Sequence, residues 1–199
     1  MTFFTLMELI DVIIMTLAVG FIFSDSFRKP AEEDYDPLKE SHGRLNWENI
    51  KFAICITAPA VIFHELFHKI VALSFGLDAT FHAAYFWLGL GLVLKLINFG
   101  FIFFVPGFVE IGCSSIACHL TPLISALIAF AGPFLNMVLW LGSWTLLKIN
   151  PKFVRKSRKM YAVLYLTRNI NMFLFIFNMI PIPGFDGYKV YDGLIRTFL

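Results

Sequence analysis

Apolar runs long enough to cross a lipid bilayer are the feature of this sequence that most limits its fold. A spanning helix needs roughly 20 predominantly apolar residues, and clear runs of this kind occupy residues 3–23, 51–75, 120–148 and 161–182. Hydrophobic residues make up 58% of the chain and charged residues only 15%, which is unlike a soluble domain. We therefore expect a multi-pass integral protein of the cell membrane, in contact with the lipid bilayer.

Polar segments divide these apolar runs. Residues 24–50 contain prolines and an acidic cluster, which predict a solvated loop. Residues 148–159 contain basic but no acidic side chains. The net charge of +2 is nearly balanced, so no nucleic-acid partner is expected. We divide the chain into an N-terminal transmembrane segment with a polar loop, residues 1–50, and a core, residues 51–199.

The stretch from 77 to 119 is apolar and aromatic but is repeatedly broken by glycine. Its part from Phe99 to Ile111 is rich in Phe, Ile and Val and turns at Pro106-Gly107, which favours two short strands. Residues 84–105 fit either a full crossing or a hairpin that enters and leaves on one side. The predicted fold is mainly α: a polytopic α-helical membrane protein with a small re-entrant β-hairpin region between the second and third clear apolar segments.

Two carboxylates interrupt the first apolar run. Glu8 and Asp11 are three residues apart, so they share one face of a helix. Charged groups inside an apolar helix should face protein or water rather than lipid. We interpret the pair as a helix contact or as a wet helix end.

Three cysteines, Cys55, Cys113 and Cys118, are too few and too apolar in setting to predict a disulfide framework. A metal site formed by the last two with His119 is conceivable. Small residues in a packed membrane segment are the favoured interpretation.

The second apolar run contains the sequence His64-Glu65-Leu66-Phe67-His68, which matches H-E-x-x-H. Side chains four apart on a helix project in the same direction, so His64 and His68 can reach one zinc ion. Glu65 flanks that face and can act as a general base toward water. Ionisable groups in the middle of an apolar helix are costly unless they are paired or face a cavity. The pattern therefore predicts a catalytic zinc site.

A catalytic zinc usually has three protein ligands and one open position. Ten residues after the first histidine the chain has Ser74, and the region beyond offers Asp78, His82 and Glu110, none of them persuasive. Asp186 is favoured as the third ligand because it ends an apolar segment in a Pro-broken turn. Irregular backbone at membrane depth is tolerated only beside protein or a water-filled cavity.

The segment NMIPIPGFDG, residues 178–187, completes a resemblance to a known family. Together with H-E-x-x-H it resembles the signature of the site-2 proteases, which are intramembrane metalloproteases. The resemblance implies that His64, His68 and Asp186 hold zinc, that Glu65 activates water, and that Asn178 contacts the substrate backbone or the developing oxyanion. AGPFLN, residues 131–136, resembles the family's Gly-Pro element, which makes Asn136 a second substrate-binding candidate.

The resemblance covers Lys51 to Gly187 and has one departure, Phe67, where many members carry a small residue. It implies an altered pocket lining. With no PDZ-like insertion, we do not expect an attached soluble domain to select substrates. The family arrangement also puts the zinc toward the cytoplasm and the basic residues 148–159 outside, against the positive-inside tendency.

The predicted function is that of a zinc metalloendopeptidase that hydrolyses peptide bonds of a transmembrane protein substrate with a zinc-activated water. Residues 99–111 would offer a strand edge to an extended substrate. One alternative is an intramembrane zinc-binding transporter, which gives Glu65 no reason to lie beside the ligands. Another is a non-catalytic substrate-binding membrane protein, against which the intact Glu65 argues.

Overall fold

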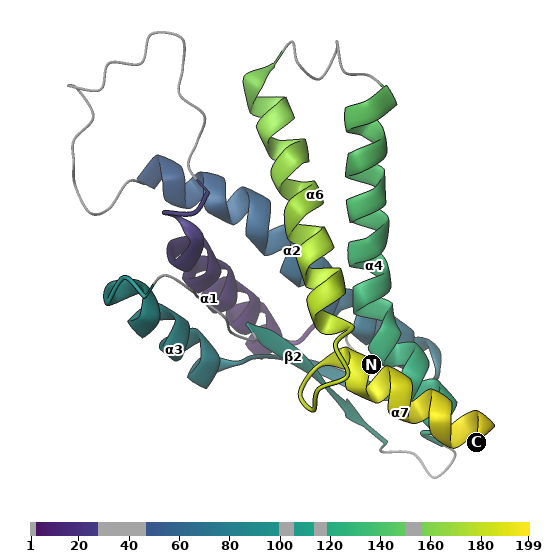
Figure 1. The fold of residues 1–199 in the computed structure, drawn as a ribbon. Coiled ribbons are helices and arrows are strands. Elements are labelled where there is room, and N and C mark those ends of the chain that lie inside the picture. The colour runs from purple at the N-terminus through teal and green to yellow at the C-terminus, as the bar shows by residue number, and fades with distance from the viewer. Residues whose placement is uncertain (1–2, 28–46, 100–105, 114–118, 150–156) are drawn as a thin grey trace, which may run out of the picture.

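Four helices among the described residues are long and apolar enough to cross a membrane. The computed structural model describes residues 3–27, 47–99, 106–113, 119–149 and 157–199. The four helices are α1 (Leu6–Phe23), α2 (Trp47–Ser74), α4 (Pro122–Ile149) and α6 (Arg158–Asn178) (Figure 1). They confirm that each of the four apolar runs forms a helix long enough to cross a membrane, with boundaries shifted by a few residues.

The four helices alternate in direction. Glu8, near the start of α1, meets Lys69 near the end of α2, whereas Gly20 packs on Ile54 near the start of α2. The two histidines of α2 likewise meet α4 in reverse chain order. The helices α4 and α6 lie side by side in opposite directions (Figure 1). The start of α1, the end of α2, the start of α4 and the end of α6 therefore lie toward one side of the molecule.

A two-stranded antiparallel sheet lies between α2 and α4 in the chain, formed by β1 (Asp78–Ala83) and β2 (Gly107–Gly112). It confirms the predicted β-region in a mainly helical fold. The strand β2 overlaps the predicted Phe99–Ile111 hairpin and ends one residue beyond it, but its partner β1 was not predicted. Residues 100–105, in the other arm of that hairpin, lie outside the described residues.

The helix α3 (Tyr85–Leu96) separates the two strands and lies along α1. Its 12 residues extend about 18 Å, short of the roughly 30 Å of a hydrocarbon core. The Ala84 N–H, just before α3, donates to the Pro106 carbonyl, just before β2, at 3.1 Å. The residues on either side of the stretch 85–105 are therefore neighbours in space, and α3 alone is too short to span a membrane.

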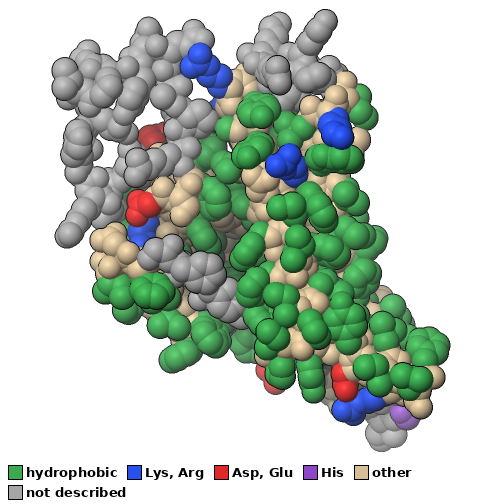
Figure 2. Space-filling model, viewed as in Figure 1, with side chains coloured by type: hydrophobic (Ala, Val, Ile, Leu, Met, Phe, Trp, Pro, Cys, Tyr) green, Lys and Arg blue, Asp and Glu red, His purple; other side chains and the backbone are tan. Residues whose placement is uncertain are grey.

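The packed interior joins α1, α2, β1 and α3. Met15 and Val19 from α1 contact Val61 from α2, Phe81 from β1 and Leu88 from α3. The outer faces of α4 and α6 instead carry exposed apolar side chains, and Figure 2 shows hydrophobic groups covering most of the visible surface there. Burial of apolar groups in the interior stabilises the bundle, while the apolar exterior suits a lipid environment.

One cysteine departs from the expectation. Cys113, directly after β2, is disulfide-bonded, so the prediction that the cysteines are only packing residues was wrong for this one. Cys118 lies outside the described residues, and Cys55 is free and exposed.

Candidate metal centre

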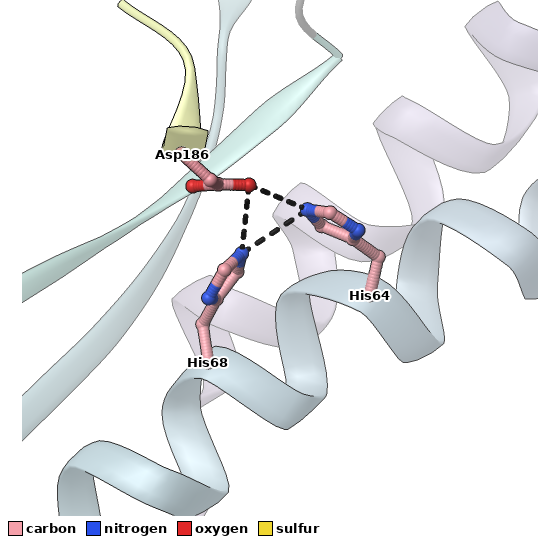
Figure 3. A group of neighbouring side chains, drawn as sticks. All are labelled: His64, His68 and Asp186. Carbon is pink, nitrogen blue, oxygen red and sulfur yellow. Dashed lines mark hydrogen bonds and ion pairs between the residues drawn. The ribbon is translucent and has the colours of Figure 1, made fainter. Parts of the chain in front are cut away.

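Three predicted ligands converge on one point (Figure 3). The Nε2 atoms of His64 and His68 are 3.1 Å apart, and Asp186 Oδ2 lies 3.1 Å from the first and 3.3 Å from the second. Zinc bonds of about 2.0–2.1 Å in a tetrahedron place neighbouring donor atoms about 3.3 Å apart. The donor atoms, two imidazole nitrogens and a carboxylate oxygen, therefore suit zinc in both chemistry and spacing.

Local structure explains how these residues meet. The two histidines occupy successive turns of α2, and both are buried. Asp186 is the first residue of α7 (Asp186–Phe198), which follows the turn after α6. Gly184 in that turn has φ +101, and a Cβ on Gly187 would lie 2.5 Å from the Met179 carbonyl carbon. Only glycine permits this close return of the chain, which brings Asp186 onto the histidines.

The other nitrogen of each imidazole is fixed by a hydrogen bond. His68 Nδ1 donates to the Ile128 carbonyl at 2.7 Å, and His64 Nδ1 donates to the Asn136 side-chain oxygen. The Asn136 amide in turn donates to the Asn171 side-chain oxygen at 2.8 Å. In the neutral imidazoles these hydrogen bonds hold the proton on Nδ1, so both Nε2 lone pairs face the common point, which is the tautomer that a metal requires.

Gly132 of α4 lies directly against this point. A Cβ built there would collide with the Nε2 atoms of both His64 and His68. The absence of a side chain lets α4 approach the two imidazoles closely enough for the Ile128 and Asn136 contacts to form.

Gly132→Ala should therefore reduce zinc binding sharply. The added methyl group has to displace both metal-binding nitrogens. We expect zinc affinity to fall at least as much as it does when a supporting hydrogen bond is lost, about 10–100-fold. Zinc content after dialysis against a competing chelator measures it. The matched control is Gly142→Ala in the same helix, where a Cβ meets nothing within 4 Å. Full zinc retention in Gly132→Ala would contradict the packing described here.

Glu65 lies beside the three ligands without belonging to the group. It is buried and lines a cavity of about 1000 Å³ whose walls also include His64, His68, Asp186 and β2. A carboxylate next to the donor atoms and open to a cavity can exchange protons with a water bound there.

Asp186 is the one ligand of this centre that does not lie on one of the four long apolar helices. Burial alone would raise the pKa of its carboxyl, but the charge and hydrogen bonds of His68 and His64 in their protonated form outweigh burial and hold the pKa well below its usual range. The side chain is therefore ionised at neutral pH, as a metal ligand must be.

The two predicted substrate-binding residues lie in different surroundings. Asn178, the last residue of α6, is half-buried and lines the cavity. Asn136 is 0% exposed and its side chain is occupied by His64, Asn171 and the Ala60 carbonyl. Among the described residues, the disfavoured ligands Asp78, His82 and Glu110 do not join the metal group. The sequence reasoning missed Asn171 and the Ile128 carbonyl, which no local pattern marks.

Comparison with known proteins gives one informative relative. A protein of Methanocaldococcus jannaschii named "Putative zinc metalloprotease" is 36% identical to this chain over 189 residues, covering 94% of this chain and 84% of the relative. No family model and no solved structure matches the chain. Identity at this level along nearly the whole of both chains, together with a donor set suited to zinc, shows that the protein belongs to the same zinc metalloprotease family as its archaeal relative.

Proposed function

We propose that the protein is an intramembrane zinc endopeptidase of the site-2 type, which hydrolyses peptide bonds in the membrane-spanning segments of other proteins in the cell membrane. One observation carries the proposal. His64, Glu65, His68 and Asp186 line a single cavity whose other walls come from α1, α4, α6 and the strand β2. Three of these walls, with α2 itself, are helices able to cross a membrane.

The depth of the site along these helices supports the proposal. His68 precedes the end of α2 at Ser74 by six residues, or about 9 Å, and Gly132 follows the start of α4 at Pro122 by ten residues, or about 15 Å. A hydrocarbon core is about 30 Å thick. Helices that span it would hold the three ligands below the membrane surface.

The chemistry follows from the roles of the side chains. Zinc held by His64, His68 and Asp186 would polarise the scissile carbonyl and lower the pKa of water. Glu65 would accept the proton of the attacking water and pass it to the leaving amine. Asn178 would donate to the carbonyl oxygen as negative charge develops there. No covalent intermediate with the protein is needed.

The strand β2 offers a binding edge for an extended substrate. In the sheet, Phe81 is opposite Val109 and Ala83 is opposite Gly107. The N–H groups of Phe81 and Ala83 point away from β2, because they donate to side chains of α1. In an antiparallel pair the opposite residue then also directs its N–H and C=O groups outward, so Val109 and Gly107 direct theirs away from β1. Both residues line the metal cavity. A substrate segment that unwinds could add there as a third strand, close to the ligands.

The test is cleavage of single-span substrates by the purified protein in lipid vesicles, with products identified by mass spectrometry. We expect cuts within the spanning segments, loss of cleavage with a zinc chelator, and recovery when zinc is returned. Cuts confined to soluble flanking regions, or cleavage indifferent to the chelator, would contradict the proposal. Zinc flux into the vesicles without cleavage would support the transporter alternative.

A further inference from the structure

Two carboxylates of α1 contact the backbone of β1. Glu8 Oε1 accepts the Phe81 N–H at 2.8 Å, and Asp11 Oδ2 accepts the Ala83 N–H at 3.2 Å. Both side chains are buried, with 2% and 6% exposed. A charged group inside an apolar helix is costly unless it has such partners.

The two amides belong to the outer edge of β1. Alternate residues of an edge strand direct their N–H groups away from the sheet, about 6.6–6.8 Å apart. Residues three apart on a helix are about 5–6 Å apart, so Glu8 and Asp11 nearly match that spacing. The carboxylates thus occupy the place of a third strand, and they satisfy amides that could not face lipid unpaired.

The same carboxylates connect this edge to the surrounding helices. Glu8 forms a buried ion pair with Lys69, the residue that follows the ligand His68 on α2. Asp11 also accepts a hydrogen bond from the Tyr85 hydroxyl at the start of α3. The sheet is therefore tied through α1 to the helix that carries two metal ligands.

We infer that Glu8 and Asp11 are positioning residues for substrate. They close the outer edge of β1, so that among the described strands only β2 can receive a substrate segment. They also hold the sheet in place, which keeps the edge of β2 in register with the metal ligands. The inference rests on the proposed endopeptidase function. This role differs from simple helix packing, because it requires a side chain that accepts a hydrogen bond from the strand N–H.

Asp11→Ala tests the inference without leaving a buried lysine unpaired. The Ala83 N–H loses its acceptor and the sheet is less firmly held. For a membrane-spanning substrate in vesicles we expect KM to rise roughly tenfold, the scale of one lost hydrogen bond, with kcat and zinc content unchanged. Asp11→Asn should restore KM, because its amide oxygen can accept from Ala83 while the Tyr85 hydroxyl turns to accept from the amide nitrogen.

Two comparison variants bracket the effect. Asp25→Ala removes a carboxylate just beyond α1 that is 68% exposed and pairs with Lys95, so KM should not change. Val109→Pro removes a donor from the outer edge of β2 itself and should raise KM directly. If Asp11→Ala does not fold, Asp11→Ser can replace it, since a serine hydroxyl can bond within its own helix but is too short to reach the strand.

Hydrogen–deuterium exchange gives a readout that does not depend on proteolysis. The Ala83 amide should exchange faster in Asp11→Ala than in wild type and be protected again in Asp11→Asn. Unchanged KM and exchange in the alanine variant, or failure of asparagine to restore them, would overturn the inference. A wild-type protein that cleaves nothing would instead count against the proposed function, and the exchange measurement would still decide whether Asp11 caps the strand.

Discussion

Glu65→Gln should abolish peptide hydrolysis while leaving the zinc in place. Glutamine has nearly the same shape as glutamate but cannot accept the proton of the attacking water, and the loss of a general base costs about 10²–10⁴-fold in rate. Zinc should stay because Glu65 is not one of the three side chains whose donor atoms converge. Cleavage of a single-span substrate and elemental analysis of the same preparation measure the two effects.

The matched control is Glu48→Gln, the same change at the exposed start of α2, where the carboxylate pairs with Lys51. It should leave both cleavage and zinc at wild-type levels. Zinc loss in Glu65→Gln would make the residue a ligand or a structural support. Cleavage that persists with zinc bound would require a different base.

Asp186→Ala should lose zinc and, with it, all hydrolysis. Two imidazoles from one helix would remain, which is one ligand fewer than a catalytic zinc normally has. The fall in zinc affinity should exceed the roughly 10–100-fold that the loss of a supporting hydrogen bond costs. Elemental analysis after dialysis against a graded series of chelators measures it.

Asp192→Ala is the control for Asp186→Ala. It removes an aspartate from the same helix, at a position where the side chain pairs with Arg196 near the surface. Zinc content should not change. If Asp186→Ala retained stoichiometric zinc, the third ligand would have to be sought elsewhere in the cavity.

The helical part of the metal group could be predicted because its pattern is local. The spacing of His64 and His68 is the period of a helix, and an apolar context for charged residues marks a site. Asp186 lies 118 positions beyond His68, so no periodicity connects them. Its Pro-broken turn and the family resemblance were needed to bring it into the prediction, and the structure then places its oxygen beside both imidazoles.

The support around the ligands could not be predicted in the same way. Asn136 was predicted as a substrate-binding residue from resemblance, and that role stays a prediction. Its hydrogen bond to His64 depends on how closely α4 approaches α2, which the missing side chain at Gly132 decides. Such a contact has no signature in either segment taken alone.

The strand β1 was missed for a related reason. Its buried positions include Ala79 and Ala83, and alanine has a low preference for strands. Its outer amides are satisfied by side chains of α1, more than 70 positions earlier in the chain. Glu8 and Asp11 were expected to face protein or water rather than lipid, but the sequence does not show that their partner is a strand.

The hydrogen bond between Ala84 and Pro106 has a topological consequence. Because the intervening chain returns to its origin, α1, α2, α4 and α6 are the only candidate crossings among the described residues, and their number is even. Four crossings by these helices would place the stretches before α1 and after α6 in one aqueous compartment, on the side nearer the metal ligands. In that arrangement Lys148, Arg158 and Lys159, at the opposite ends of α4 and α6, would face the other compartment. The orientation of such a molecule in the membrane would then be a single binary choice.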